Sequence, residues 1–112
     1  MEHDRWVPVG PAAEVAGPPW PCHDVAGMAL RLVRTPDGDV VAVGAACPHL
    51  GAPLTHAEVT SERVVCVHHF YEFALTDGRN LFPGWEEAQL AVFPSRVVDG
   101  VVEVRVAAEP GR

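Results

Sequence analysis

The sequence contains no lysine and no isoleucine, and only three of its 112 residues are cysteines. Its apolar runs fall well short of the ~20 consecutive residues that a membrane-spanning helix requires, so we expect no membrane span. No basic segment followed by an apolar stretch opens the chain, so we expect no secretory signal and a cytoplasmic location. An odd, small number of cysteines also argues against the disulfide framework of a small secreted domain.

Positive charge is scarce as well. Eight arginines stand against 15 acidic residues, which gives a net charge of −7. Nucleic acids and anionic membranes select proteins with clustered cations, so this balance argues against both as partners. It is compatible with docking onto a basic patch of a partner protein, or the acidic residues simply keep the chain in solution. Hydrophobic residues make up 48% of the sequence, and the length suits a single folded domain over residues 1–112.

Valine is the most abundant apolar residue, with nineteen copies against seven leucines, and it occurs in short runs between turn dipeptides. Such runs favour strands over helices. In the last run, Val102, Val104 and Val106 fall on one face of a strand, while Glu103 and Arg105 fall on the other. A period of two is typical of a half-buried antiparallel strand. We therefore predict an all-β fold, a small antiparallel sandwich or barrel.

Turn signals such as Pro36-Asp37-Gly38-Asp39 and Asp99-Gly100 bound the predicted strands. Residues 11–21 form a Pro- and Gly-rich connector, residues 12–16 and 86–91 can each form no more than a helical turn, and long loops are expected after Ala45 and Leu81. The strands are predicted at Trp6–Val9, Met28–Arg34, Val40–Gly44, Val64–Cys66, Tyr71–Leu75, Ala91–Val98 and Val101–Val106.

Two segments outside this valine-rich pattern combine a thiol with an imidazole. Residues 47–54 (CPHLGAPL) contain Cys47 and His49, and residues 66–73 (CVHHFYEF) contain Cys66 and His69. The sixteen residues between His49 and Cys66 are enough for one hairpin that brings the two loops side by side. Two thiolates and two imidazoles form a complete ligand set for zinc, on one tetrahedral atom, or for an iron–sulfur centre with its ligands divided between two irons.

The double motif C-x-H, sixteen residues, C-x-x-H resembles the signature of Rieske [2Fe-2S] proteins. The likeness includes the Pro, Gly and Leu of the first segment and the terminal hairpin, and it covers nearly the whole chain. It implies one Rieske-type [2Fe-2S] cluster per chain, held by a cluster-binding subdomain of two loops at about residues 45–85. By this resemblance Cys47 and Cys66 bind one iron, and His49 and His69 bind the other.

The second loop departs from the family pattern at two positions. Phe70 stands where the family has Gly after the second histidine, and His68 places another imidazole beside the predicted ligand. We assign His69 as the ligand because C-x-x-H is the family's spacing. We expect His68 to cover the cluster or to face solvent.

Other positions distinguish the chain from the Rieske subunits of respiratory and photosynthetic complexes. Those subunits have an extra cysteine in each loop, joined as a disulfide, and the matching residues here are Ala52 and His68. Tyr71 and Phe73 replace their Ser and Tyr hydrogen-bond donors. Fewer donors to the cluster predict a lower reduction potential. With no membrane anchor expected, the chain resembles a soluble Rieske-type ferredoxin.

This resemblance implies a one-electron carrier that passes electrons from a reductase to an oxygenase or a similar acceptor. The chain would then be an electron-transfer component rather than a stand-alone catalyst, because 112 residues leave no room for a mononuclear-iron domain. Alternatives are a small [2Fe-2S] subunit of a larger reductase such as nitrite reductase, a structural zinc-binding module, or a redox or iron sensor. Colour and metal content separate zinc from iron, and co-purification with a large partner identifies a fixed subunit.

We also expect an apolar collar, a third loop near the cluster and one free thiol. Leu50, Gly51 and Phe70 would surround the electron exit as an apolar collar. Pro83-Gly84-Trp85 stands where the family has a third loop beside the cluster. Cys22 has no partner loop and is expected to be a free thiol.

Overall fold

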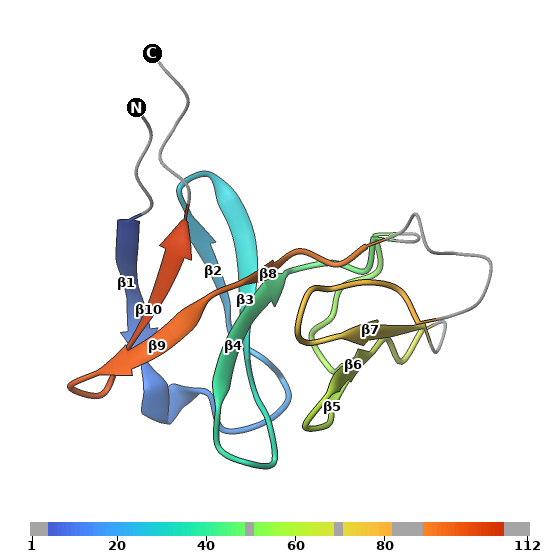
Figure 1. Cartoon of the computed structure of the whole chain (residues 1–112), viewed down its shortest axis with the longest axis horizontal. Coiled ribbons are helices and arrows are strands. Elements are labelled where there is room, and N and C mark those ends of the chain that lie inside the picture. The colour runs from blue at the N-terminus through green and yellow to red at the C-terminus, as the bar shows by residue number, and fades with distance from the viewer. Residues whose placement is uncertain (1–4, 49–50, 69–70, 82–88, 107–112) are drawn as a thin grey trace.

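The computed structural model describes residues 5–48, 51–68, 71–81 and 89–106 (Figure 1). Within these ranges the regular structure is β-strand apart from one 3₁₀ turn, η1 (Ala12–Glu14), and every strand pairing is antiparallel. The predicted all-β antiparallel fold is confirmed. The strands are β1 (Arg5–Pro11), β2 (Cys22–Val25), β3 (Met28–Arg34), β4 (Val40–Gly44), β5 (Glu58–Val59), β6 (Arg63–Val65), β7 (Glu72–Ala74), β8 (Val92–Phe93), β9 (Ser95–Val98) and β10 (Val101–Val106).

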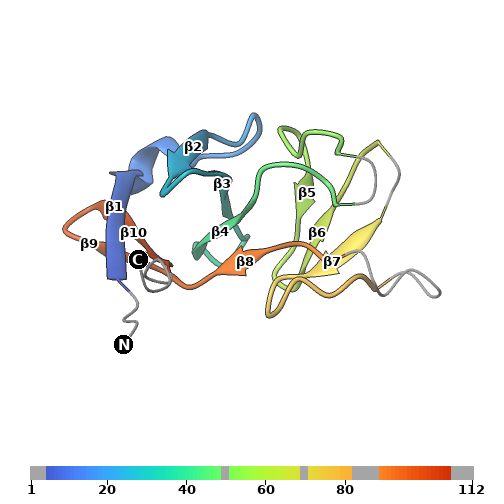
Figure 2. The same cartoon turned by 90° about the horizontal axis from the view of Figure 1, so that it is seen from above.

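The strands form three sheets, with the orders β1-β10-β9, β2-β3-β4-β8 and β5-β6-β7. The first two sheets lie together and are called the base here. The third, the small sheet, lies to one side of the base in both views (Figures 1 and 2). The chain passes from the base to the small sheet after β4 and returns into β8 (Figure 1). No helix in the described ranges is long and apolar enough to cross a membrane.

One hydrophobic core extends from the base into the small sheet. Val102 and Val104 of β10 are fully buried and Val106 is 2% exposed, so the predicted face of this strand is confirmed. The same cluster of buried residues includes Phe73 of the small sheet, which has no exposed surface. Burial of these apolar side chains is the main stabilising contribution to the fold.

The hairpin between β9 and β10 has the geometry that its sequence predicts. Asp99 and Gly100 have φ of +51° and +79°, and Val98 pairs with Val101 across them. Positive φ at both central residues defines the type I′ turn, whose twist matches that of the flanking strands.

The predicted continuous strand Ala91–Val98 is wrong. It is divided at Pro94 into β8, which pairs with β4, and β9, which pairs with β10. Proline has no N–H for the ladder, so it ends one pairing and lets the chain change sheets. The Ser95 hydroxyl supports this crossing, since it accepts a hydrogen bond from the Ala42 N–H and donates one to the Phe93 carbonyl, each 3.0 Å long.

Two strands, β2 and β5, are absent from the sequence-based prediction. Strand β2 has only one buried residue, Val25, and its hairpin to β3 turns on Ala26 and Gly27, with φ of +52° and +81°. Alanine rarely adopts this conformation, so the turn has no sequence signal. The predicted helical turn near residues 12–16 corresponds to η1. Of the turn expected at 86–91, only residues 89–91 are described, and they form no regular structure.

Candidate metal centre

The structure buries both predicted cysteine ligands at the start of a loop. Cys47 and Cys66 have no exposed surface, neither forms a disulfide, and both belong to the same core cluster. Cys47 follows the short bridge between Ala46 and Pro53, and Cys66 follows the last residue of β6. Each thiol therefore lies where a strand-like pairing ends and a loop begins.

The two loops are closed in the same way. The Cys47 N–H donates a 2.7 Å hydrogen bond to the Ala52 carbonyl, and the Cys66 N–H donates a 2.9 Å bond to the Tyr71 carbonyl. In both cases the acceptor lies five residues after the cysteine. We call residues 47–52 the first loop and residues 66–71 the second loop. Each motif thus begins at the cysteine whose N–H closes the loop and ends before the residue whose carbonyl accepts that hydrogen bond.

Part of the predicted site lies outside the described residues. This is the case for His49 and His69, for Leu50 and Phe70 of the expected collar, and for Pro83-Gly84-Trp85. Within the described ranges, no group of three or more His, Cys, Asp or Glu side chains gathers as a metal site. The ligand assignment therefore stays a prediction. The described neighbour His68 is exposed, and Cys22 is an exposed free thiol.

The first loop is supported by Arg31 of the base and by Trp20 of the connector that precedes β2. Arg31 of β3 donates from Nε to the Ala45 carbonyl (3.1 Å) and from Nη1 to the Trp20 carbonyl (2.8 Å). Trp20 donates its backbone N–H to the Thr55 carbonyl and its indole N–H to the Ala57 carbonyl, both at 2.8 Å. Ala45 precedes the loop, whereas Thr55 and Ala57 follow it, so both flanks of the first loop are bonded to this pair.

The second loop is supported through the small sheet and one close backbone contact. Tyr71, the last residue of the loop, and Phe73 of β7 are 8% and 0% exposed. After β7 the chain turns at Gly78, which has φ of +80° and whose carbonyl accepts a 2.8 Å hydrogen bond from the Leu90 N–H. A Cβ at position 78 would overlap the Leu90 carbonyl oxygen, so only glycine fits this contact.

Sequence reasoning did not single out Arg31 or Trp20. The one signal for Arg31 is a cation within the otherwise apolar strand Met28–Val33. Trp20 lies in the Pro-rich connector, where nothing in the sequence shows that its indole reaches a carbonyl 37 residues away. Both residues act through long-range hydrogen bonds, which only the tertiary structure brings about.

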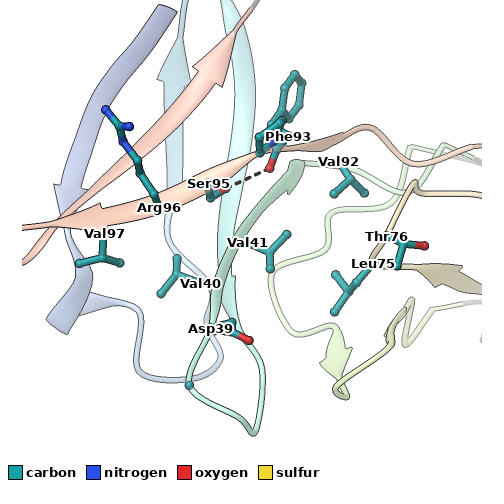
Figure 3. Close-up of a pocket in the computed structure, with 12 residues that line it drawn as sticks. Asp39, Val40, Val41, Leu75, Thr76, Val92, Phe93, Ser95, Arg96 and Val97 are labelled. Atoms are coloured by element: carbon teal, nitrogen blue, oxygen red, sulfur yellow. Dashed lines mark hydrogen bonds between the residues drawn. The ribbon is translucent and has the colours of Figure 1, made fainter.

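The structure also contains a groove of about 550 Å³, which lies apart from both loops. Valines of β4 and β9 line it together with Leu75 and Thr76 from the turn after β7 (Figure 3). Its lining contains no cysteine or histidine. The Ser95 hydroxyl in the groove is bonded to the Phe93 carbonyl (Figure 3). The groove therefore offers no sulfur or imidazole ligand, and the candidate iron–sulfur centre remains with the loops.

The donors of the two loops fit an iron–sulfur cluster. Cys47 and Cys66 supply soft sulfur ligands and are not joined to each other as a disulfide. Their burial excludes water, which is typical of a shielded redox centre. Because the two loops are closed alike and share one core cluster, the chain provides one thiol from each of two matching loops.

The comparison with known families identifies the chain. Residues 5–94 match the Rieske [2Fe-2S] domain. The match covers well over half of the sequence, so the chain belongs to the Rieske [2Fe-2S] domain family. Membership implies a Rieske-type [2Fe-2S] cluster and a role in electron transfer. The family resemblance and the cofactor predicted from the sequence are confirmed.

Some solved structures with the same fold match this chain over nearly their whole length, and others match it over about a third of theirs. A chain named as an NADH-dependent nitrite reductase small subunit, from Mycobacterium tuberculosis, is 24% identical with a TM-score of 0.81, and the match covers 96% of this chain and 99% of that one. Dicamba monooxygenase bound to dicamba is 24% identical with a TM-score of 0.74, but the match covers 89% of this chain and only 31% of that one.

NdmA of Pseudomonas putida CBB5 is also matched over only part of its length. It is 22% identical with a TM-score of 0.74, and the match covers 89% of this chain and 33% of that one. At these identities the likeness establishes the fold alone. No curated protein matches the sequence.

Proposed function

We propose that Cys47 and Cys66 bind one iron of the [2Fe-2S] cluster and that His49 and His69 bind the other. The observation that supports this most directly is the identical closure of the two loops, with a buried thiol at the start of each. In the sequence, His49 lies between Cys47 and Ala52, and His69 lies, next to His68, between Cys66 and Tyr71. We assign residues 45–85 as the cluster-binding part of a single domain.

We further propose that the chain is a one-electron relay between proteins in the cytoplasm. A reductase would supply the electron, and an oxygenase or reductase component would accept it. The cluster stores one electron, and the chain's own residues hold it and exclude water from its sulfur ligands. The exposed residues Pro48 and Gly51 of the first loop belong to the surface on which a partner would dock.

A fixed small subunit of a nitrite-reductase-type enzyme is the second candidate. It is favoured by coverage, because the match spans 99% of the Mycobacterium tuberculosis chain but only about a third of the dicamba monooxygenase and NdmA chains. Under this alternative the same cluster passes electrons within one stable complex. The relay would then have a permanent partner rather than two transient ones.

The ligand assignment is tested by optical and electron-spin-resonance spectra of the protein, as isolated and after dithionite reduction. The wild type and His68→Ala should show the signature of a two-iron cluster with mixed Cys and His ligands. His69→Ala should lose that signature. A colourless wild-type protein containing zinc would contradict the proposal, and loss of the signature in His68→Ala alone would transfer the ligand role to His68.

The two partner arrangements are separated by a reconstitution experiment. As a free relay, the purified protein should oxidise and reduce repeatedly between a ferredoxin reductase and an acceptor, with a rate that is proportional to its concentration. As a fixed subunit, it should co-elute with a large reductase subunit and fail to exchange electrons when free.

A further inference from the structure

Arg31 connects the first loop to the base through two hydrogen bonds from one guanidinium group. Its guanidinium bonds the carbonyl of Ala45, two residues before Cys47, and the carbonyl of Trp20 in the connector. Both acceptors are neutral. The ion pairs found in the described residues are Arg63–Glu72 and Arg96–Glu103, so within that part of the chain Arg31 forms no ion pair. A half-buried permanent positive charge thus lies next to the start of the first loop.

Trp20 extends this connection to the other flank of the loop. It is 5% exposed, and it bonds Thr55 and Ala57, which follow the first loop in the chain. Ala45 itself also accepts a 3.0 Å hydrogen bond from the Leu54 N–H. Arg31, Trp20 and these backbone groups therefore form a continuous hydrogen-bonded clamp around both flanks of the loop that contains Cys47.

A cation at this position has an electrostatic consequence. Reduction adds one negative charge to the cluster, and a nearby positive charge favours the state with that added electron. Burial strengthens such an interaction because less water screens it. The smaller number of hydrogen-bond donors at positions 71 and 73 predicts a low reduction potential. The positive charge of Arg31, next to the first loop, would raise that potential.

We propose that Arg31 is a positioning residue for the cluster, holding the first loop in place through the clamp and raising the reduction potential by its charge. The proposal rests on the proposed function, in which Cys47 is a cluster ligand. It assigns two separable roles to one side chain, one that depends on hydrogen-bond geometry and one that depends on charge.

Arg34 provides a matched control on the same strand. It is also half-buried, and its guanidinium also bonds backbone carbonyls, those of Val15 (2.7 Å), Ala12 (2.7 Å) and Gly38 (2.8 Å). It lies three residues further from the β3 end where Ala45 is bonded, which is about 10 Å along a strand. Arg34→Gln therefore removes the same charge and a similar clamp at a greater distance from the first loop.

The test compares wild type, Arg31→Gln, Arg31→Lys and Arg34→Gln as cluster-loaded proteins. Two quantities are measured: the reduction potential, by redox titration followed by spin resonance, and the rate of cluster loss to an iron chelator. Arg31→Gln should lower the potential and lose the cluster roughly tenfold faster, because charged hydrogen bonds to two carbonyls are removed. Arg31→Lys should keep a potential close to wild type but lose the cluster faster, since it retains the charge without the planar fork.

Arg34→Gln should leave both quantities close to wild type. If Arg31→Gln and Arg34→Gln give the same potential and the same rate of loss, the proposal is wrong, while the [2Fe-2S] assignment still stands on the spectra. If Arg31→Gln retains no cluster while Arg34→Gln does, the positioning role is supported, and the potential of Arg31→Lys decides the role of charge. A wild type without the cluster signature would instead contradict the proposed function itself.

Discussion

The two loops of the candidate centre are closed alike but attached to the molecule differently. Each begins with a buried cysteine whose N–H bonds the carbonyl five residues further on. The first loop is then held by two side chains, Arg31 of the base and Trp20 of the connector. The second loop continues into the small sheet, which contacts the chain leading back to the base through the backbone of Gly78 and Leu90.

This difference shows two physical solutions to one requirement. Side-chain clamps provide several directed hydrogen bonds, and each can be weakened gradually by a conservative substitution. A glycine contact depends on the absence of one carbon atom, so any side chain disrupts it at once. We therefore expect the first loop to respond in graded fashion to mutation and the second to respond abruptly.

The largest effect should come from the cysteines, where the loops are equivalent. Cys47→Ala and Cys66→Ala should each abolish the [2Fe-2S] absorption, because each removes one of the two thiolates that we propose bind the same iron. Cys22→Ala is the matched control and should retain the full absorption, since this thiol is exposed on β2. If either Cys47→Ala or Cys66→Ala retained the cluster, the two cysteines would not both be ligands, and the two loops would not be equivalent.

The next largest effect is expected at the backbone contact of the second loop. Gly78→Ala should lower the free energy of unfolding by more than about 3 kcal/mol, because it adds both positive-φ strain and a clash with Leu90. Gly38→Ala shares the positive φ but has no atom within 4 Å of the added carbon, so it should cost only about 1–2 kcal/mol. Urea unfolding measures both, and equal costs would contradict the role of the contact.

The smallest effect is expected at the clamp of the first loop. Trp20→Phe keeps an aromatic side chain but removes the indole N–H and part of the buried ring system, which leaves the Ala57 carbonyl without this donor and should cost about 1–3 kcal/mol of unfolding free energy. Trp6→Phe is the control: Trp6 is half-buried and stacks under Arg96, 4.1 Å from the ring centre, so about 0.5–1 kcal/mol is expected there. A Trp20→Phe protein as stable as wild type would show that the clamp contributes nothing.

Much of the base was predictable because its signals are local. The alternation of Val102 and Val104 with polar residues and the Asp99-Gly100 turn depend on neighbours in the chain, and the structure confirms them. The error at Pro94 has the same origin. A valine-rich run resembles one strand, and the change of sheet at the proline depends on which partners β8 and β9 find.

The candidate site was predictable to a different extent. Cys47 and Cys66 were found because their spacing to histidine is a sequence property, and the structure places both thiols in one buried cluster. The supports of the loops were not found, since Arg31 reaches a carbonyl 14 residues away and the indole of Trp20 one 37 residues away. No local pattern encodes such contacts.

The sequence by itself determined the class of fold, the candidate ligand types and their spacing, because alternation, turn residues and soft metal donors are properties of short segments. The tertiary structure decided which groups hold those segments in place. Hydrogen bonds such as those of Arg31 form only after distant strands have packed, and the fit of Gly78 against Leu90 exists only between surfaces that folding brings together.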